Sequence, residues 1–89
     1  MRFTYDLQLE SLSVLFSEKQ PVLQHIYPRN PMILIEIDGE GSVCRIQIDK
    51  PHLGGWFTND LIYEYKLGIN EAYILTVLFE NRHLFFRME

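Results

Sequence analysis

Residues with the chemistry of an active site gather in one stretch of this sequence, KPHLGGWFTNDLIYEY at positions 50–65. It contains His52, a Gly54-Gly55 pair, the only tryptophan (Trp56) and Asp60. A histidine can bind a metal or move a proton, and glycines let a backbone approach a ligand closely. The stretch nevertheless lacks the Gly-Lys-Ser/Thr ending of a phosphate loop, and no ligand or nucleophile stands at a characteristic spacing from His52. We therefore predict no catalytic centre here.

Metal binding and nucleophilic catalysis find no better support in the rest of the chain. His25, His52 and His83 are far apart in the sequence and match no zinc spacing. Cys44 is the only cysteine, and its apolar alternating run SVCRIQI predicts a buried, unreactive thiol. We predict no metal, no cofactor and no enzymatic activity. Paired carboxylates would need Glu36 and Glu64 to converge, but alternation along their strands already explains both positions.

The Trp56 region supports two interpretations. As a protruding loop, it would present Trp56 and Phe57 beside carboxylates, and aromatic anchors of this kind dominate protein–protein binding energy. As a plug, Trp56 would fold back and close one end of a small core. We favour the plug for Trp56 and assign partner contacts to the neighbouring acids. The predicted partner-binding residues are Asp38, Glu40, Asp49, Trp56, Asp60 and Glu64.

Composition limits the class of protein. The chain of 89 residues is 47% apolar, which predicts one small globular domain over residues 1–89. Twelve acidic against eight basic side chains leave a net charge of -4. A nucleic-acid binder normally needs clustered basic residues, so this balance argues against one and favours a protein partner with a basic surface.

The elements that must position these residues begin with a strand. Residues 1–10 alternate strictly between apolar and polar side chains, as a half-buried strand does. Residues 11–27 are predicted to contain one short helical segment, capped by Ser11, because apolar residues recur there at spacings of three and four. The run from Pro28 to Pro31 must stop that helix.

From residue 32 onward the pattern predicts an antiparallel meander. Residues 32–38 and 43–49 flank the turn sequence GEGS as a hairpin would. Residues 61–67, 72–79 and 84–88 are predicted to be further strands, because β-branched and aromatic side chains dominate them. The alternative is a pair of helices, one from an Asp60 cap to Gly68 and one from an Asn70 cap through Arg82. The predicted fold is α+β, mainly antiparallel β, with about six strands.

These features favour a small acidic binding protein that inhibits or neutralises another protein. Examples are the immunity protein of a toxin–immunity pair, for instance against a nuclease toxin, or a phage-encoded anti-defence inhibitor. The alternative is an assembly module that forms a homodimer or larger homo-oligomer through an aromatic face or a sheet edge such as LFFRME. A lone cysteine and the lack of a signal-like or membrane-spanning apolar run favour the cytoplasm and no membrane partner.

Overall fold

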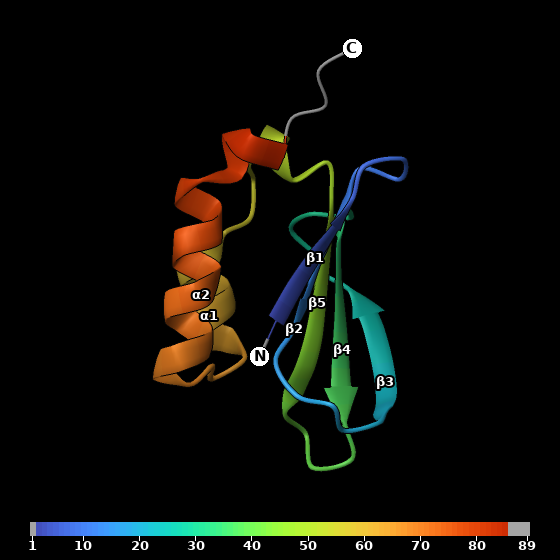
Figure 1. Cartoon of the computed structure of the whole chain (residues 1–89). Helices are drawn as coiled ribbons and strands as arrows, with labels where there is room; N and C mark the ends of the chain where they lie inside the picture. Colours follow the sequence, from blue (N-terminus) through green and yellow to red (C-terminus); the bar gives the residue numbers. More distant parts are fainter. Residues whose placement is uncertain (1, 86–89) are drawn as a thin grey trace.

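The computed structural model describes residues 2–85 as a five-stranded antiparallel sheet with two α-helices on one of its faces (Figure 1). Residues 1 and 86–89 lie outside the described part. The elements are the strands β1 (Arg2–Asp6), β2 (Ser11–Leu15), β3 (Pro21–Ile26), β4 (Ile33–Asp38) and β5 (Val43–Asp49), the helices α1 (Thr58–Glu64) and α2 (Ile69–Glu80), and the 3-10 helices η1 (Pro51–Leu53) and η2 (Arg82–Phe85).

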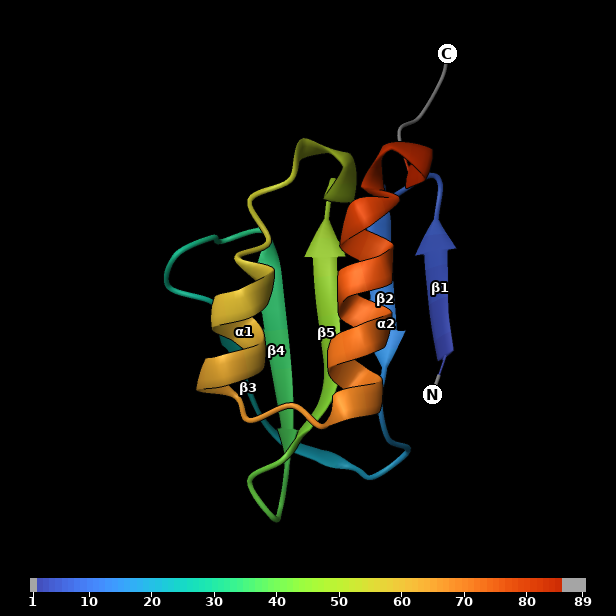
Figure 2. The same ribbon diagram turned by 90° about the vertical axis from the view of Figure 1, so that its left-hand side faces the viewer.

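The strand order β1-β2-β5-β4-β3 gives the sheet a Greek-key connection. The strands β3, β4 and β5 form a meander, and the chain crosses one end of the sheet between β2 and β3 so that β2 pairs with β5. Figure 2 shows α1 lying over β3 and β4, and α2 lying beside it over β5 and β2. Within residues 2–85 no helix covers the other face of the sheet.

The hairpin of β4 and β5 confirms the prediction made from alternation around GEGS. Ile33 pairs with Ile48 and Ile35 with Ile46, and all four side chains are buried against the helices. Period-two alternation is the pattern expected of a sheet with one covered and one solvated face.

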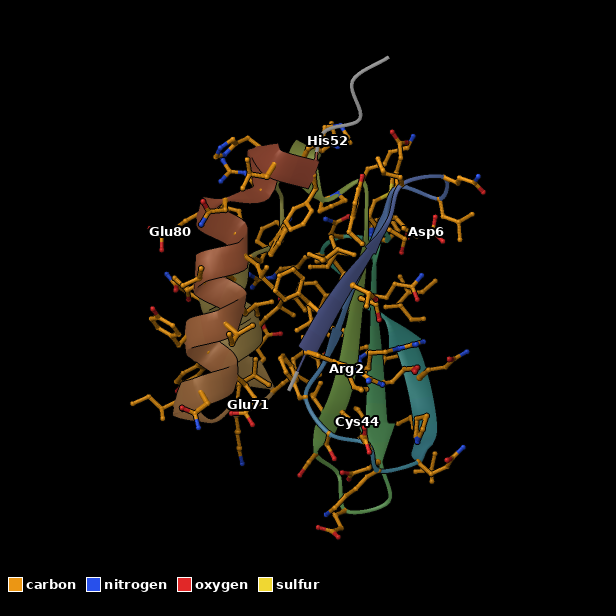
Figure 3. The ribbon with its side chains drawn as sticks, viewed as in Figure 1. Arg2, Asp6, Cys44, His52, Glu71 and Glu80 are labelled. Carbon is orange, nitrogen blue, oxygen red and sulfur yellow. The ribbon has the colours of Figure 1, made fainter. Side chains whose placement is uncertain are left out.

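A β-bulge changes the position of Cys44. Glu36 pairs with Arg45 while Ile37 pairs with Val43, so Cys44 is the extra residue on β5. The prediction that Cys44 is buried is confirmed. Cys44, labelled in Figure 3, is not among the core residues beneath the helices. It borders a hollow that Glu36 and Arg45 also line.

The prediction of strands at residues 61–67 and 72–79 is wrong. The alternative of two helices is correct in element type, but the helices begin after Phe57 and Gly68 and not at caps formed by Asp60 and Asn70. Some of the β-branched and aromatic side chains here, such as Ile74 and Phe79, pack against the core, and others, such as Tyr63, are exposed. Leu61 of α1 and Leu75 and Leu78 of α2 are buried in the core. Tertiary packing of this kind overrides weak intrinsic propensity.

The prediction of a helical segment in residues 11–27 is also wrong, because this region forms β2 and β3. Leu12 and Val14 alternate with serines and are buried, so the period in β2 is two. Pro21 begins an edge strand, where its missing N–H costs no ladder bond. The predicted closing strand fails as well, since Leu84 and Phe85 lie in η2 and the remainder lies outside the described residues.

The prediction of about six strands and one helical segment therefore gives the class correctly and the element count incorrectly. The core lies between the sheet and the helices, and it includes the aromatic residues Phe16, Tyr27 and Trp56. The end of the molecule that carries the β4–β5 turn and the α1–α2 loop is called the turn end below (Figure 1).

Candidate partner-binding site

The predicted binding residues fall at separate places in the fold. Asp38 and Glu40 belong to the β4–β5 turn, and Glu64 lies at the end of α1 beside the same turn end. Asp60 lies one helical turn earlier on α1. Asp49 ends β5 at the opposite end of the sheet. The structure thus brings Asp38, Glu40 and Glu64 to one end of the molecule and leaves Asp49 apart.

Asp38 serves the turn itself. Its Oδ1 accepts hydrogen bonds from the backbone N–H groups of Glu40 at 2.8 Å and Ser42 at 3.1 Å. Its side chain is buried, with 4% of the residue exposed. These bonds, that of Ser42 above all, hold the pKa of the Asp38 carboxyl below its ordinary value. The carboxylate is therefore ionised at neutral pH but faces its own backbone, which leaves little of it for a partner.

Trp56 adopts the position of a plug. It has no exposed surface, and its indole Nε1–H donates a 2.9 Å hydrogen bond to the carbonyl oxygen of Pro51. Its ring meets that of Phe79 on α2 at 5.4 Å between centroids and 63° between planes, an edge-to-face contact. The backbone reaches this position through left-handed conformations at Gly54, Gly55 and Phe57. Trp56 offers no contact area to a partner in this conformation.

Two further acids are engaged in exposed ion pairs. Glu40 Oε1 lies 2.8 Å from the Nζ of Lys19, and this carboxylate raises the pKa of the Lys19 amine. Asp60 pairs with Arg29 in the loop after β3. Exposed pairs of this kind contribute little to stability. In each pair, however, the cation neutralises the charge that the carboxylate would otherwise present to a partner.

A cleft of about 450 Å³ opens at the turn end, between the β4–β5 turn and the α1–α2 loop. Its acidic wall comes from Glu64 and from Glu71 in the first turn of α2, which is labelled in Figure 3. Neither of these glutamates takes part in an ion pair with a described residue. The lining residues are Gly41, Ser42, Val43, Glu64, Tyr65, Lys66, Leu67, Gly68 and Glu71.

The phenol of Tyr27 holds Glu64 at the edge of this cleft, and the phenol of Tyr65 bonds elsewhere. The hydroxyl of Tyr27 on the loop after β3 donates to Glu64 Oε2 at 3.2 Å. The hydroxyl of Tyr65 lies 2.7 Å from Nε2 of His25, with which it shares a hydrogen bond. Burial, followed by the Glu64 charge, raises the pKa of both Tyr27 and Tyr65. Both phenols therefore remain neutral at physiological pH, and Tyr27 remains a hydrogen-bond donor to Glu64.

Glu71 has a local reason for its position. Gly68 is the N-cap of α2, and the Glu71 carboxylate folds back over it so closely that a β-carbon on Gly68 would lie 2.6 Å from Oε2. A carboxylate in the first turn of a helix is also favoured by the helix dipole. The space left by the missing side chain of Gly68 and the attraction of the helix dipole together keep the Glu71 carboxylate at the mouth of the cleft.

Exposed apolar side chains lie close to these acids in the sequence and on the same helices. Tyr63 is 85% exposed, Ile69 86% and Tyr73 68%. These three residues and Glu71 are not among the binding residues predicted from the sequence, because residues 61–79 are predicted as strands and their helical spacing is not used. The usable signal was Gly68 followed three residues later by a glutamate, which is typical of a helix start.

Other chemistry finds little support in the described part of the chain. Residues 2–85 contain no group of three or more His, Cys, Asp or Glu side chains able to hold a metal ion. Burial raises the pKa of the Cys44 thiol, which disfavours the reactive thiolate. No helix among these residues has the length and apolar character needed to cross a bilayer.

The chain matches no known family model, no curated protein and no solved structure.

Proposed function

We propose that this protein is a small acidic binding protein that inhibits or neutralises another protein with a basic surface. The observation that carries the proposal is the cleft at the turn end, where Glu64 and Glu71 stand in one wall outside any ion pair with a described residue. Carboxylates held in place by their own chain need little reordering on binding, which lowers the cost of association.

The apolar part of the docking surface is assigned to the helices. Exposed tyrosines supply large contact area at low entropic cost, and they are enriched among residues that dominate binding energy. Tyr63 and Tyr73 are exposed on α1 and α2, and Glu64 directly follows the first of them. In this proposal Tyr63 and Tyr73 are the aromatic anchors, in place of Trp56.

Charge complementarity selects the class of partner. A net charge of -4, with Glu64 and Glu71 at one end, attracts a positively charged surface and steers its approach. A nuclease toxin has such a surface because it must bind phosphates, and the two carboxylates would stand in for those phosphates. An immunity protein of a toxin–immunity pair fits this description, and so does a phage-encoded inhibitor of a nuclease used in defence.

The decisive experiment measures binding to the purified product of the neighbouring gene, with association rates followed by stopped flow at increasing salt. The double variant Glu64→Gln/Glu71→Gln should lower the association rate about tenfold at low salt and flatten its salt dependence, because electrostatic steering acts mainly on the association rate. Tyr73→Ala should act mainly on the dissociation rate.

The matched control is Glu18→Gln/Glu80→Gln, which removes the same charge from exposed sites outside the cleft lining. It should change the association rate by less than about twofold, since distant exposed charges are screened. Equal effects of the two double variants would mean that only net charge matters and would remove the cleft from the proposal. Binding that is indifferent to both pairs and to salt would contradict a basic partner.

A further inference from the structure

The outer edge of β3 is an uncovered strand with no charged side chains. β3 is the last strand in the sheet order, and no strand among residues 2–85 pairs with its outer side. Val22 is 70% exposed, Leu23 56% and Ile26 58%. The segment QPVLQHIYP at 20–28 contains no Asp, Glu, Lys or Arg. Monomeric proteins usually place charges along such an edge to prevent pairing with another chain.

The direction of the free backbone groups follows from the ladder between β3 and β4. The N–H of Tyr27 donates to the carbonyl oxygen of Ile33 at 2.8 Å, and the register continues with His25 opposite Ile35. Backbone groups of alternate residues point to opposite sides of an antiparallel strand. His25 therefore directs its N–H and C=O toward β4, and Gln24 and Ile26 direct theirs outward.

We propose that a second copy of this chain pairs antiparallel with the outer edge of β3, about a two-fold axis at Gln24. In this register Gln24 lies opposite Gln24 of the second copy, and each residue exchanges N–H···O=C bonds with the other. Val22 lies opposite Ile26 of the second copy, and the symmetric pair repeats the contact. The two sheets become one sheet of ten strands.

A second copy suits this edge better than an unrelated strand because the edge is self-complementary. A two-fold axis places the same segment of both copies side by side, so an edge carrying charge of one sign repels its own copy. Here exposed aliphatic side chains meet one another, and the amide of Gln24, which can both donate and accept, meets an identical amide. Cross-strand apolar pairs of this kind stabilise a sheet.

The contact is expected to be weak. Pro21 begins the strand and a bulge lies between Pro21 and Leu23, so the regular part of the edge is short. Short interfaces belong to the small end of the range, where association is transient. The pairing uses neither Glu64 nor Glu71, so failure of this proposal and failure of the inhibitor function are distinguishable.

Sedimentation equilibrium from about 10 µM to 1 mM provides the first test. The average mass should rise from the 10.6 kDa of one chain toward twice that value. Ile26→Lys should weaken self-association at least tenfold, because it brings an unpaired charge to the seam. Leu9→Lys, at an exposed apolar site in the β1–β2 turn, should leave self-association unchanged. A monomer at all concentrations, or a dimer indifferent to Ile26→Lys, overturns the proposal.

Cross-linking tests the axis directly. Antiparallel hydrogen-bonded partners have their Cα atoms about 5.5 Å apart, within the range of a disulfide. Gln24→Cys should therefore form a disulfide-linked dimer on mild oxidation. Thr4→Cys, exposed on the other edge strand, should not. The unchanged chain controls for Cys44, which is buried. Cross-linking through Thr4→Cys but not Gln24→Cys places any dimer at β1 and overturns the pairing proposed here.

Discussion

Trp56 illustrates what a single residue can and cannot reveal in a sequence. Its large apolar ring predicts burial, but the same ring makes an effective binding anchor, and neither reading depends on its immediate neighbours. The deciding contacts come from Phe79 on α2, 23 positions away (79 − 56), and from the carbonyl of Pro51. The hydrogen bond to Pro51 satisfies the indole N–H, so the ring can be buried without an unpaired polar group.

Asp38 leads to a prediction at the same scale. Its lowered folded-state pKa means that its contribution to stability is complete above the unfolded value of about 3.9 and is lost as pH falls through the folded value. Asp38→Ala should therefore lower the urea midpoint by a constant amount from pH 7 to about pH 5. Below about pH 4 the difference from the unchanged protein should shrink, because protonation then removes the same bonds from Asp38 itself. Glu18→Ala, an exposed carboxylate outside the turn, serves as the control; a difference constant down to pH 2 would contradict the assignment.

At the scale of elements, the sequence predicts best where alternation and turn chemistry agree. The β4–β5 hairpin has both, since its isoleucines alternate and GEGS supplies the turn. The segments around α1 and α2 have neither a clear helical stripe nor a glycine directly after α1. The apolar side chains of α2 lie on several sides of the helix, because Leu75 and Leu78 face the core while Ile69 and Tyr73 are exposed. Such a helix resembles a buried strand in sequence, and only the sheet opposite it decides the matter.

The acidic surface was predictable to a lesser degree. Negative net charge follows from the sequence, and a binding role for Glu64 stays a prediction from it, but the cleft depends on the α1–α2 loop lying beside the β4–β5 turn. Gly41 and Glu71 both line this cleft but belong to different layers, and no local sequence pattern encodes their proximity. Once residues 61–79 are predicted as strands, Glu71 becomes a turn residue and Tyr73 a core residue. A wrong element type therefore removes half of the candidate site.

The end of α1 carries a testable strain. Lys66 has a φ of +52°, its N–H donates to the carbonyl of Tyr63, and the N–H of Leu67 donates to that of Ile62. This is a Schellman motif, in which glycine normally occupies the left-handed position. Lys66→Gly should raise the free energy of unfolding by about 0.5–1 kcal/mol, and Tm by a few degrees. The strain relief exceeds the entropy that glycine adds to the unfolded chain.

Lys66→Ala separates this effect from that of charge. It removes the same cation from the cleft but keeps a β-carbon at the left-handed position, so it should bring no gain in Tm. Thermal unfolding followed by circular dichroism measures all three proteins. Equal stabilisation by glycine and alanine would show that repulsion or solvation of Lys66, and not backbone strain, limits the stability of this loop.

At the scale of the whole molecule, the sheet and the helices depend on one shared core. The buried cluster includes Leu12 from β2, Ile46 from β5, Trp56 from the connecting loop and Leu75 from α2. Because of the Greek-key connection, β2 can pair only after β5 has formed, and its partners lie 30 (Leu15 to Arg45) to 38 (Ser11 to Asp49) positions further along the chain. An 89-residue chain has no second core on which the helices alone, or the sheet alone, would be stable.

The protein should therefore unfold in a single cooperative transition. Trp56 reports the contact between the helix layer and the loop, and far-UV circular dichroism reports sheet and helices together. The two signals should give the same urea midpoint, with emission that starts blue-shifted because the ring is fully buried. Measurement at a few micromolar keeps the chain below the concentrations at which β3 pairing would add a second equilibrium. Loss of helical signal before the Trp56 transition would show that α1 and α2 detach from a sheet that stays folded. That result would contradict a shared core, because layers that share one core unfold together.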